Sequence, residues 1–138
     1  MLGTIRYADE LSKKTEIIMQ TLYGWNQATP AMVEKAKQIK NELDVIKLAF
    51  NGYQAKASWE EVPPGPQPLN RRLNYLMYTH NSNTSALTKT EKDTYQILKE
   101  ELPPFIKKLK KAGSEIETLQ KEMQALGAPW LPGQMPEL

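Results

Sequence analysis

The side chain best suited to chemistry in this sequence is its only histidine, His80. A histidine that acts as a general base needs an orienting partner and a nucleophile within reach. The hydroxyls of Ser82 and Ser85 are close to it along the chain, but the spacing matches no catalytic triad. A histidine near the end of a helix commonly binds the last free carbonyls instead. We therefore interpret His80 as a helix-terminal residue and expect no catalytic residue in this chain.

The acidic side chains do not form a recognisable metal-ligand set. There is no cysteine to provide a thiolate, and the pairs Glu60-Glu61 and Glu100-Glu101 are sequence neighbours. Neighbours on a helix point in different directions, so neither pair converges on one ion. The sequence also lacks a Glu-x-x-His pair of the di-iron bundle type and a glycine-rich phosphate loop. We expect neither a metal nor a cofactor.

The charge pattern argues against nucleic acid and membrane partners. The 18 basic residues are almost balanced by 16 acidic ones, for a net charge of +2, whereas nucleic-acid binding depends on concentrated basic charge. The one basic cluster, at residues 107–111, could face an anionic partner. We favour a solvated helix face around a buried Leu109, balanced by nearby glutamates. No apolar run approaches the ~18 residues that a membrane span needs.

The remaining polar candidates are Asn70 and Arg71, which follow a proline-rich stretch. Arginine and asparagine can hold loops through several hydrogen bonds. We expect one of them to tie the proline-rich stretch, or the polar loop at residues 80–85, to the last helix. This role is structural, not catalytic.

Apolar residues recur at alternating spacings of three and four, the period of a helix with one buried face. The pattern predicts a single all-α, four-helix bundle-like domain over residues 1–138. It consists of a helical hairpin (1–52), a proline-rich strap (53–68), a short helix and a long helix (69–126) and a tail (127–138). Capping residues set the helix limits: Thr29 with Pro30, Asn51-Gly52, Thr88 with Glu91, and Gly127.

The expected helices are residues 4–25, 30–50, 69–78 and 88–126. The residues expected to face inward are Ala8, Leu11, Thr15, Ile18, Leu22, Trp25, Met32, Ala36, Ile39, Leu43, Ile46, Phe50, Leu69, Leu73, Leu76, Met77, Tyr95, Leu98, Leu102, Phe105, Leu109, Ala112, Ile116, Leu119, Met123 and Leu126. Trp59 and Val62 are expected to pin the strap onto the bundle, and Trp130 to pack back onto it.

The last helix contains Pro103-Pro104 and Gly113, yet its apolar register continues past them. A break in the helix would usually shift the following apolar residues onto a different face. Because no such shift occurs, we favour one long helix kinked at the prolines. The alternative is a stop at Leu102, a restart with Pro103 in the first position and another restart at Ser114.

Four segments, taken in order, resemble a known family. They are residues 68–76, residues 84–88, Tyr95 with residues 100–104, and residues 127–133. Together they resemble the C-terminal helical domain of large bacterial BNR-repeat, sortilin-like β-propeller proteins, often labelled glycosyl hydrolases. The resemblance covers about residues 62–138. It departs from the family pattern at Leu87, where proline is expected, and at Leu131, where threonine is expected.

The resemblance implies that the chain is a C-terminal piece of a larger, extracytoplasmic protein whose propeller carries any hydrolase activity. The partner implied is the propeller of the same parent chain. Formation of a homo-oligomer is the other alternative. A non-catalytic accessory domain should then expose an apolar or aromatic patch, involving Trp25, Tyr53, Trp59 or Trp130. The alternatives are a carbohydrate-binding helper, with Trp59 or Trp130 beside Asn70, Asn81 and Asn83, and a free-standing helical interaction domain.

Overall fold

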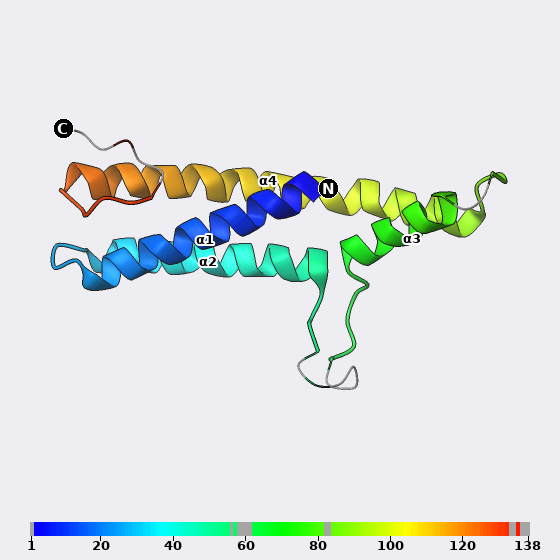
Figure 1. Cartoon of the computed structure of the whole chain (residues 1–138), viewed down its shortest axis with the longest axis horizontal. Helices are drawn as coiled ribbons and strands as arrows, with labels where there is room; N and C mark the ends of the chain where they lie inside the picture. The colour runs from blue at the N-terminus through cyan, green and yellow to red at the C-terminus, as the bar shows by residue number, and fades with distance from the viewer. Residues whose placement is uncertain (1, 56, 58–61, 82–83, 133–134, 136–138) are drawn as a thin grey trace. The chain divides into compact units, whose positions relative to one another are not determined.

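The chain is all-α in the computed structural model, which describes residues 2–55, 57, 62–81, 84–132 and 135. Within these ranges it forms four helices and no strand, as the sequence predicts. They are α1 (Leu2–Gly24), α2 (Pro30–Asn51), α3 (Leu69–Asn81) and α4 (Lys89–Ala125) (Figure 1). The main difference from the expected limits is α3, which continues to Asn81.

The helices contribute to two compact units. The first unit comprises residues 1–45 and 108–138, and the second comprises residues 46–107. The first therefore contains α1, most of α2 and the C-terminal part of α4. The second contains the end of α2, the strap, α3 and the N-terminal part of α4.

The first unit has a well-filled core between three helical segments. Polar contacts at its edge join α1 to α2, where Lys40 Nζ lies 2.9 Å from both Ser12 Oγ and Glu16 Oε1. Gly113 on α4 lets Tyr7 approach closely, because a Cβ there would lie 2.6 Å from the tyrosine hydroxyl. The buried apolar residues follow the predicted stripes, with one addition from the tail: Ala8, Leu11, Ile18, Leu22, Met32, Ala36, Ile39, Leu43, Leu109, Ala112, Ile116, Leu119, Met123 and Leu131.

The second unit has a smaller core. Its buried apolar residues are Ile46, Phe50, Leu69 and Leu98. The ring of Phe50 packs against that of Phe105 with centroids 5.9 Å apart and planes tilted by 58°. Other inward positions are only half-buried, namely Leu73, Leu76, Leu102 and Ile106. Much of the apolar surface of this unit therefore stays in contact with solvent.

The predicted N-terminal caps are present. The Met32 amide lies 3.3 Å from Thr29 Oγ1, which satisfies one of the free donors at the start of α2. At the start of α4, the Thr88 amide donates to Glu91 Oε2 at 2.7 Å and the Glu91 amide donates to Thr88 Oγ1 at 3.3 Å. This reciprocal pair is the capping box that the sequence predicts.

The predicted C-terminal caps are also present, and both use a glycine with positive φ. Gly52 (φ 73°) donates its amide to Leu48 O at 2.7 Å. Gly127 (φ 76°) follows α4, and the Ala128 amide donates to Met123 O at 3.0 Å, a Schellman motif. Both glycines adopt a backbone conformation that costs other residues free energy.

The last helix runs unbroken through Pro103 and Pro104, so the alternative with a stop at Leu102 is wrong. Each proline removes a helical hydrogen bond, and its ring crowds the preceding turn. Both prolines are exposed, and the helix has buried anchors on either side of them, Leu98 and Leu109. Those anchors explain why the buried apolar residues keep their helical spacing on both sides of the two prolines.

Four residues predicted to face inward are exposed instead, namely Met77, Tyr95, Leu126 and Trp130. At Tyr95 the inward stripe passes through the shorter Thr94, whose hydroxyl donates to Thr90 O at 2.7 Å. Met77 lies one position beyond the Leu69–Leu73–Leu76 stripe and therefore points outward.

The two remaining corrections concern the end of α4 and the tail. Leu126 lies beyond the last residue of α4, and the tail residue that packs onto the first unit is Leu131, at 2% exposure, not Trp130 at 58%. Trp25 is half-buried just after α1. In the strap, Val62 is half-buried, whereas Trp59 lies outside the described residues.

Candidate functional site

His80 lies where the sequence predicts, exposed in the last turn of α3. The group that its position affects is Glu91, a carboxylate that is only 8% exposed. The hydrogen bond from the Thr88 amide, then that from the Thr79 hydroxyl, hold the pKa of Glu91 below its ordinary value, against the opposing effect of burial. The charge of His80 contributes in the same direction. These four residues therefore join the end of α3 to the start of α4.

The two polar residues after the strap behave differently from each other. Asn70 Nδ2 donates to Asn51 Oδ1 at 2.6 Å, which ties α3 to the end of α2. This bond joins α3 to α2, and the prediction that Asn70 or Arg71 ties the strap or the 80–85 loop to the last helix stays a prediction. Arg71 is exposed on α3.

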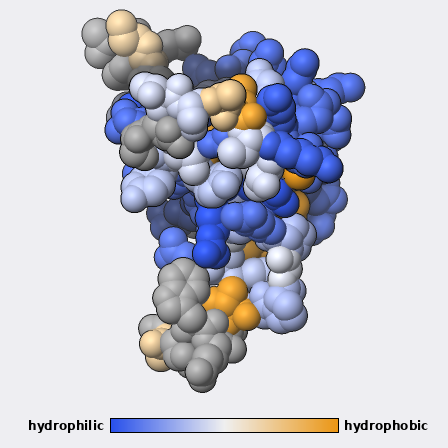
Figure 2. Space-filling model, turned by 90° about the vertical axis from the view of Figure 1, so that its right-hand side faces the viewer, coloured by the Kyte–Doolittle hydropathy of each residue, from blue (hydrophilic) through white to orange (hydrophobic). Residues whose placement is uncertain are grey.

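Exposed aromatic side chains occur in both units: Tyr7, Tyr23 and Trp130 in the first, and Tyr53 with three further tyrosines in the second. Tyr75 and Tyr78 on α3 are 41% and 79% exposed, and Tyr95 on α4 is 61% exposed. We call these three residues the tyrosine surface. Met77 and Leu87, at 58% and 46% exposure, add apolar area in the same unit. On the face drawn in Figure 2, hydrophilic side chains predominate, and only scattered hydrophobic ones reach the surface between them.

Thr79 on α3 and Glu91 on α4 are close enough for the threonine hydroxyl to lower the pKa of the glutamate. Tyr75 precedes Thr79 by one helical turn, and Tyr95 follows Glu91 by one turn. Counted from these two residues, Tyr75 and Tyr95 are therefore each about one helical turn away along their own helices. Of the three residues of the tyrosine surface, the sequence analysis named only Tyr95, and it expected that residue to face inward. The spacing of Tyr75 and Tyr78, on the side of α3 away from its leucines, was the signal that could have found the others.

The tryptophan and asparagine residues considered for sugar binding are divided between the units. Trp130 is 58% exposed in the first unit. Asn70 and Asn81 are in the second unit, half-buried and exposed respectively. Trp59 and Asn83 lie outside the described residues. Among the described residues, neither unit by itself therefore combines one of these tryptophans with these asparagines.

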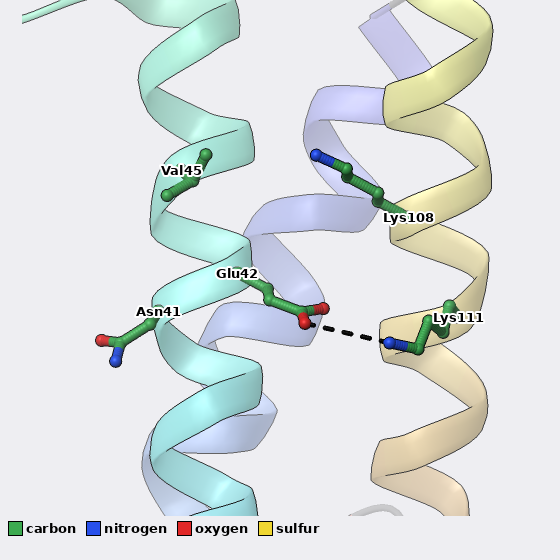
Figure 3. Close-up of a pocket in the computed structure, with 5 residues that line it drawn as sticks. All are labelled: Asn41, Glu42, Val45, Lys108 and Lys111. Atoms are coloured by element: carbon green, nitrogen blue, oxygen red, sulfur yellow. Dashed lines mark ion pairs between the residues drawn. The ribbon is translucent and has the colours of Figure 1, made fainter.

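The first unit has a shallow groove of about 310 Å³ between α2 and α4. Its lining residues are Asn41, Glu42 and Val45 on α2 and Lys108 and Lys111 on α4 (Figure 3). Lys108 and Lys111 extend from α4 toward α2, and Glu42 reaches toward Lys111, whereas Asn41 points away. The groove thus lies beside the basic cluster at residues 107–111.

Glutamates balance the basic charge of this groove. Lys111 Nζ lies 3.5 Å from Glu115 Oε1 on its own helix and 3.9 Å from Glu42 Oε1 across the groove. Such exposed pairs contribute little to stability, but they cancel the local positive potential. These ion pairs agree with the interpretation of the cluster as a solvated helix face around Leu109, which is 2% exposed.

No group of three or more histidine, aspartate or glutamate side chains in the described ranges is placed to hold a metal ion. None of the described helices combines the length and the apolar character that crossing a membrane requires.

No model of a protein family, curated protein or solved structure matches this chain. Over the described residues, the fold defines only the class: an all-helical protein with four helices and several exposed tyrosines.

Proposed function

We propose that this chain is a non-catalytic docking domain of a larger extracytoplasmic protein, and that it packs against the β-propeller of its own parent chain. The observation that carries the proposal is the tyrosine surface. Tyrosine is enriched in protein interfaces because its ring contributes apolar area while its hydroxyl stays hydrated before binding. Tyr78, at 79% exposure, is the most accessible of the three.

The character of the second unit supports the same proposal. Leu73, Leu76 and Leu102 remain only half-buried, so the unit leaves apolar area that a partner could cover. The propeller as the partner rests on the resemblance of residues 62–138 to the helical domain of propeller proteins. A free-standing helical interaction domain is the alternative within the same class.

Parentage is tested by the size of the native gene product. An antibody raised against this chain would be used on cytosolic and envelope fractions of the source organism. The proposal expects a band many times larger than 15.8 kDa in the envelope fraction. A band near 15.8 kDa in the cytosol would reject the propeller as partner.

The docking surface is tested by site-specific crosslinking within the native protein. A photoreactive amino acid replaces Tyr78, and a matched control replaces Glu10, which is exposed on α1. We expect irradiation to link position 78 to propeller peptides, identified by mass spectrometry, at several times the yield seen from position 10. Equal yields from the two positions would show that the tyrosine surface is not the docking surface.

A further inference from the structure

The strap contains a run of exposed prolines that the proposed function does not use. The proline run, defined here as Pro63-Pro64-Gly65-Pro66-Gln67-Pro68, is neither helix nor strand. Residues 63–67 are all exposed, and only Pro68 is half-buried. Pro63, Pro64 and Pro66 are therefore accessible to solvent.

The backbone of the proline run is compatible with the conformation that polyproline-binding domains recognise. It contains no cis peptide bond, and no residue in it has positive φ. Proline fixes φ near −65°, and such a run without internal hydrogen bonds adopts the left-handed polyproline helix. Figure 1 shows the stretch as an extended leg that leads to α3.

The C-terminal end of the proline run is fixed to the second unit. The ring of Pro68 lies against Gly52, so closely that a Cβ at Gly52 would be 2.5 Å from Pro68 Cγ. The Pro68 carbonyl accepts a hydrogen bond from the Arg72 amide at 3.2 Å, and the next residue, Leu69, is 2% exposed. A stiff segment on a fixed base loses little conformational freedom on binding, which favours its use as a ligand.

The polyproline helix has three residues per turn, so Pro63 and Pro66 lie on one edge of the run. This is the Pro-x-x-Pro arrangement that docks into grooves lined by aromatic side chains. The second edge carries Pro64 and Gln67. From the exposure, conformation and spacing together, we propose that the proline run is a binding segment for a partner domain with an aromatic-lined, polyproline-binding groove.

The test uses the full chain and two kinds of purified probe, SH3 domains and WW domains, chosen as a panel that spans the known Pro-x-x-Pro specificities. Isotope-labelled probe domains are titrated with the chain and followed by NMR. We expect at least one probe to bind with a Kd on the order of 100 µM, with shifts confined to its aromatic groove. No binding by any probe at millimolar concentration would overturn the proposal.

Two matched variants locate the binding edge. We expect Pro63→Ala with Pro66→Ala to weaken binding at least about tenfold, because both groove-filling rings are lost. Pro64→Ala with Gln67→Ala changes the other edge and should weaken binding only about two- to threefold, through lost stiffness. Circular dichroism should show the same unfolding midpoint for both, since all four residues are exposed.

A third variant separates the proline run from the tyrosine surface. Tyr78→Ser should leave the affinity for the probe unchanged. Loss of binding in Tyr78→Ser, or equal affinity of the two proline variants, would show that the probe binds elsewhere and would overturn the inference. The outcome is independent of the crosslinking test, which concerns position 78 alone.

Discussion

Glu91 Oε2 accepts hydrogen bonds from both the amide and the hydroxyl of Thr88, at 2.7 and 3.0 Å. Together with the Thr79 hydroxyl, these bonds lower the pKa of the Glu91 carboxyl. A carboxyl with a lowered folded-state pKa adds stability above the unfolded-state value, about 4.3, and that stability is lost as the pH falls through the lower folded-state value.

The Glu91 contribution predicts a specific change in the pH profile of stability. Thermal unfolding of wild type and Glu91→Gln is compared from pH 7 to pH 2. We expect the variant to be less stable at pH 7, and the difference to shrink as the pH falls through the lowered folded-state pKa of Glu91. Glu100→Gln, on an exposed part of α4, is the control and should follow the wild type more closely. A constant difference at every pH would contradict the assignment to ionised Glu91.

Gly52 and Pro68 should show a strong coupling in stability. Gly52→Ala adds the cost of a left-handed backbone, about 1–2 kcal/mol, and a clash with the Pro68 ring. We expect a loss of about 2–4 kcal/mol in the free energy of unfolding, measured by urea denaturation. Gly127→Ala has a similar φ but open space around the new Cβ, so it should cost only the backbone term, about 1–2 kcal/mol.

The double variant isolates the clash between the two residues. Adding Pro68→Ala to Gly52→Ala should recover part of the lost stability, because the ring that meets the new Cβ is removed. Strict additivity of the two single changes would show that the ring is not the cause.

Lys40 is the main polar connection between α1 and α2. Its Nζ lies 2.9 Å from Glu16 Oε1 and 3.0 Å from Asp44 Oδ1. Burial lowers the pKa of Lys40, but the hydrogen bonds to Glu16 and Asp44 outweigh it, so the pKa is raised overall. The stability from this group is present below the unfolded-state value, about 10.4, and is lost as the pH rises through the higher folded-state value.

Lys40→Met should therefore lower the free energy of unfolding by about 1 kcal/mol at pH 7, with a smaller loss in 1 M salt. Lys37→Met is the matched control, because Lys37 is exposed one turn earlier on α2, and it should change stability by less than about 0.5 kcal/mol. Denaturant unfolding of both variants at low and high salt measures the difference. Equal losses in the two variants would contradict the proposed connection.

Sequence periodicity predicted the helices and the core of the first unit because its buried stripes are long and regular. Their buried members, such as Ile39 and Ile116, coincide with the expected positions. Periodicity cannot show how much room the neighbouring helix leaves for a side chain. It therefore predicted that Tyr95 faces inward, whereas the shorter Thr94 occupies the inward position. The bond between Asn70 and Asn51 joins residues far apart in sequence, and it depends on where the strap returns the chain.

The tail provides a direct comparison between the residue that sequence reasoning chose and the one that packs. Leu131 is 2% exposed, whereas Trp130 is 58% exposed. Leu131→Ala should lower the free energy of unfolding by about 2–4 kcal/mol, through lost burial and the cavity left behind. Trp130→Ala removes a larger side chain, but one that is mostly solvated, and should cost less than about 1.5 kcal/mol. Leu126→Ala, at 49% exposure, is the control for a partly exposed leucine beside the same helix end. Urea unfolding followed by circular dichroism ranks the three variants, and a larger loss for Trp130→Ala than for Leu131→Ala would show that the tryptophan anchors the tail after all.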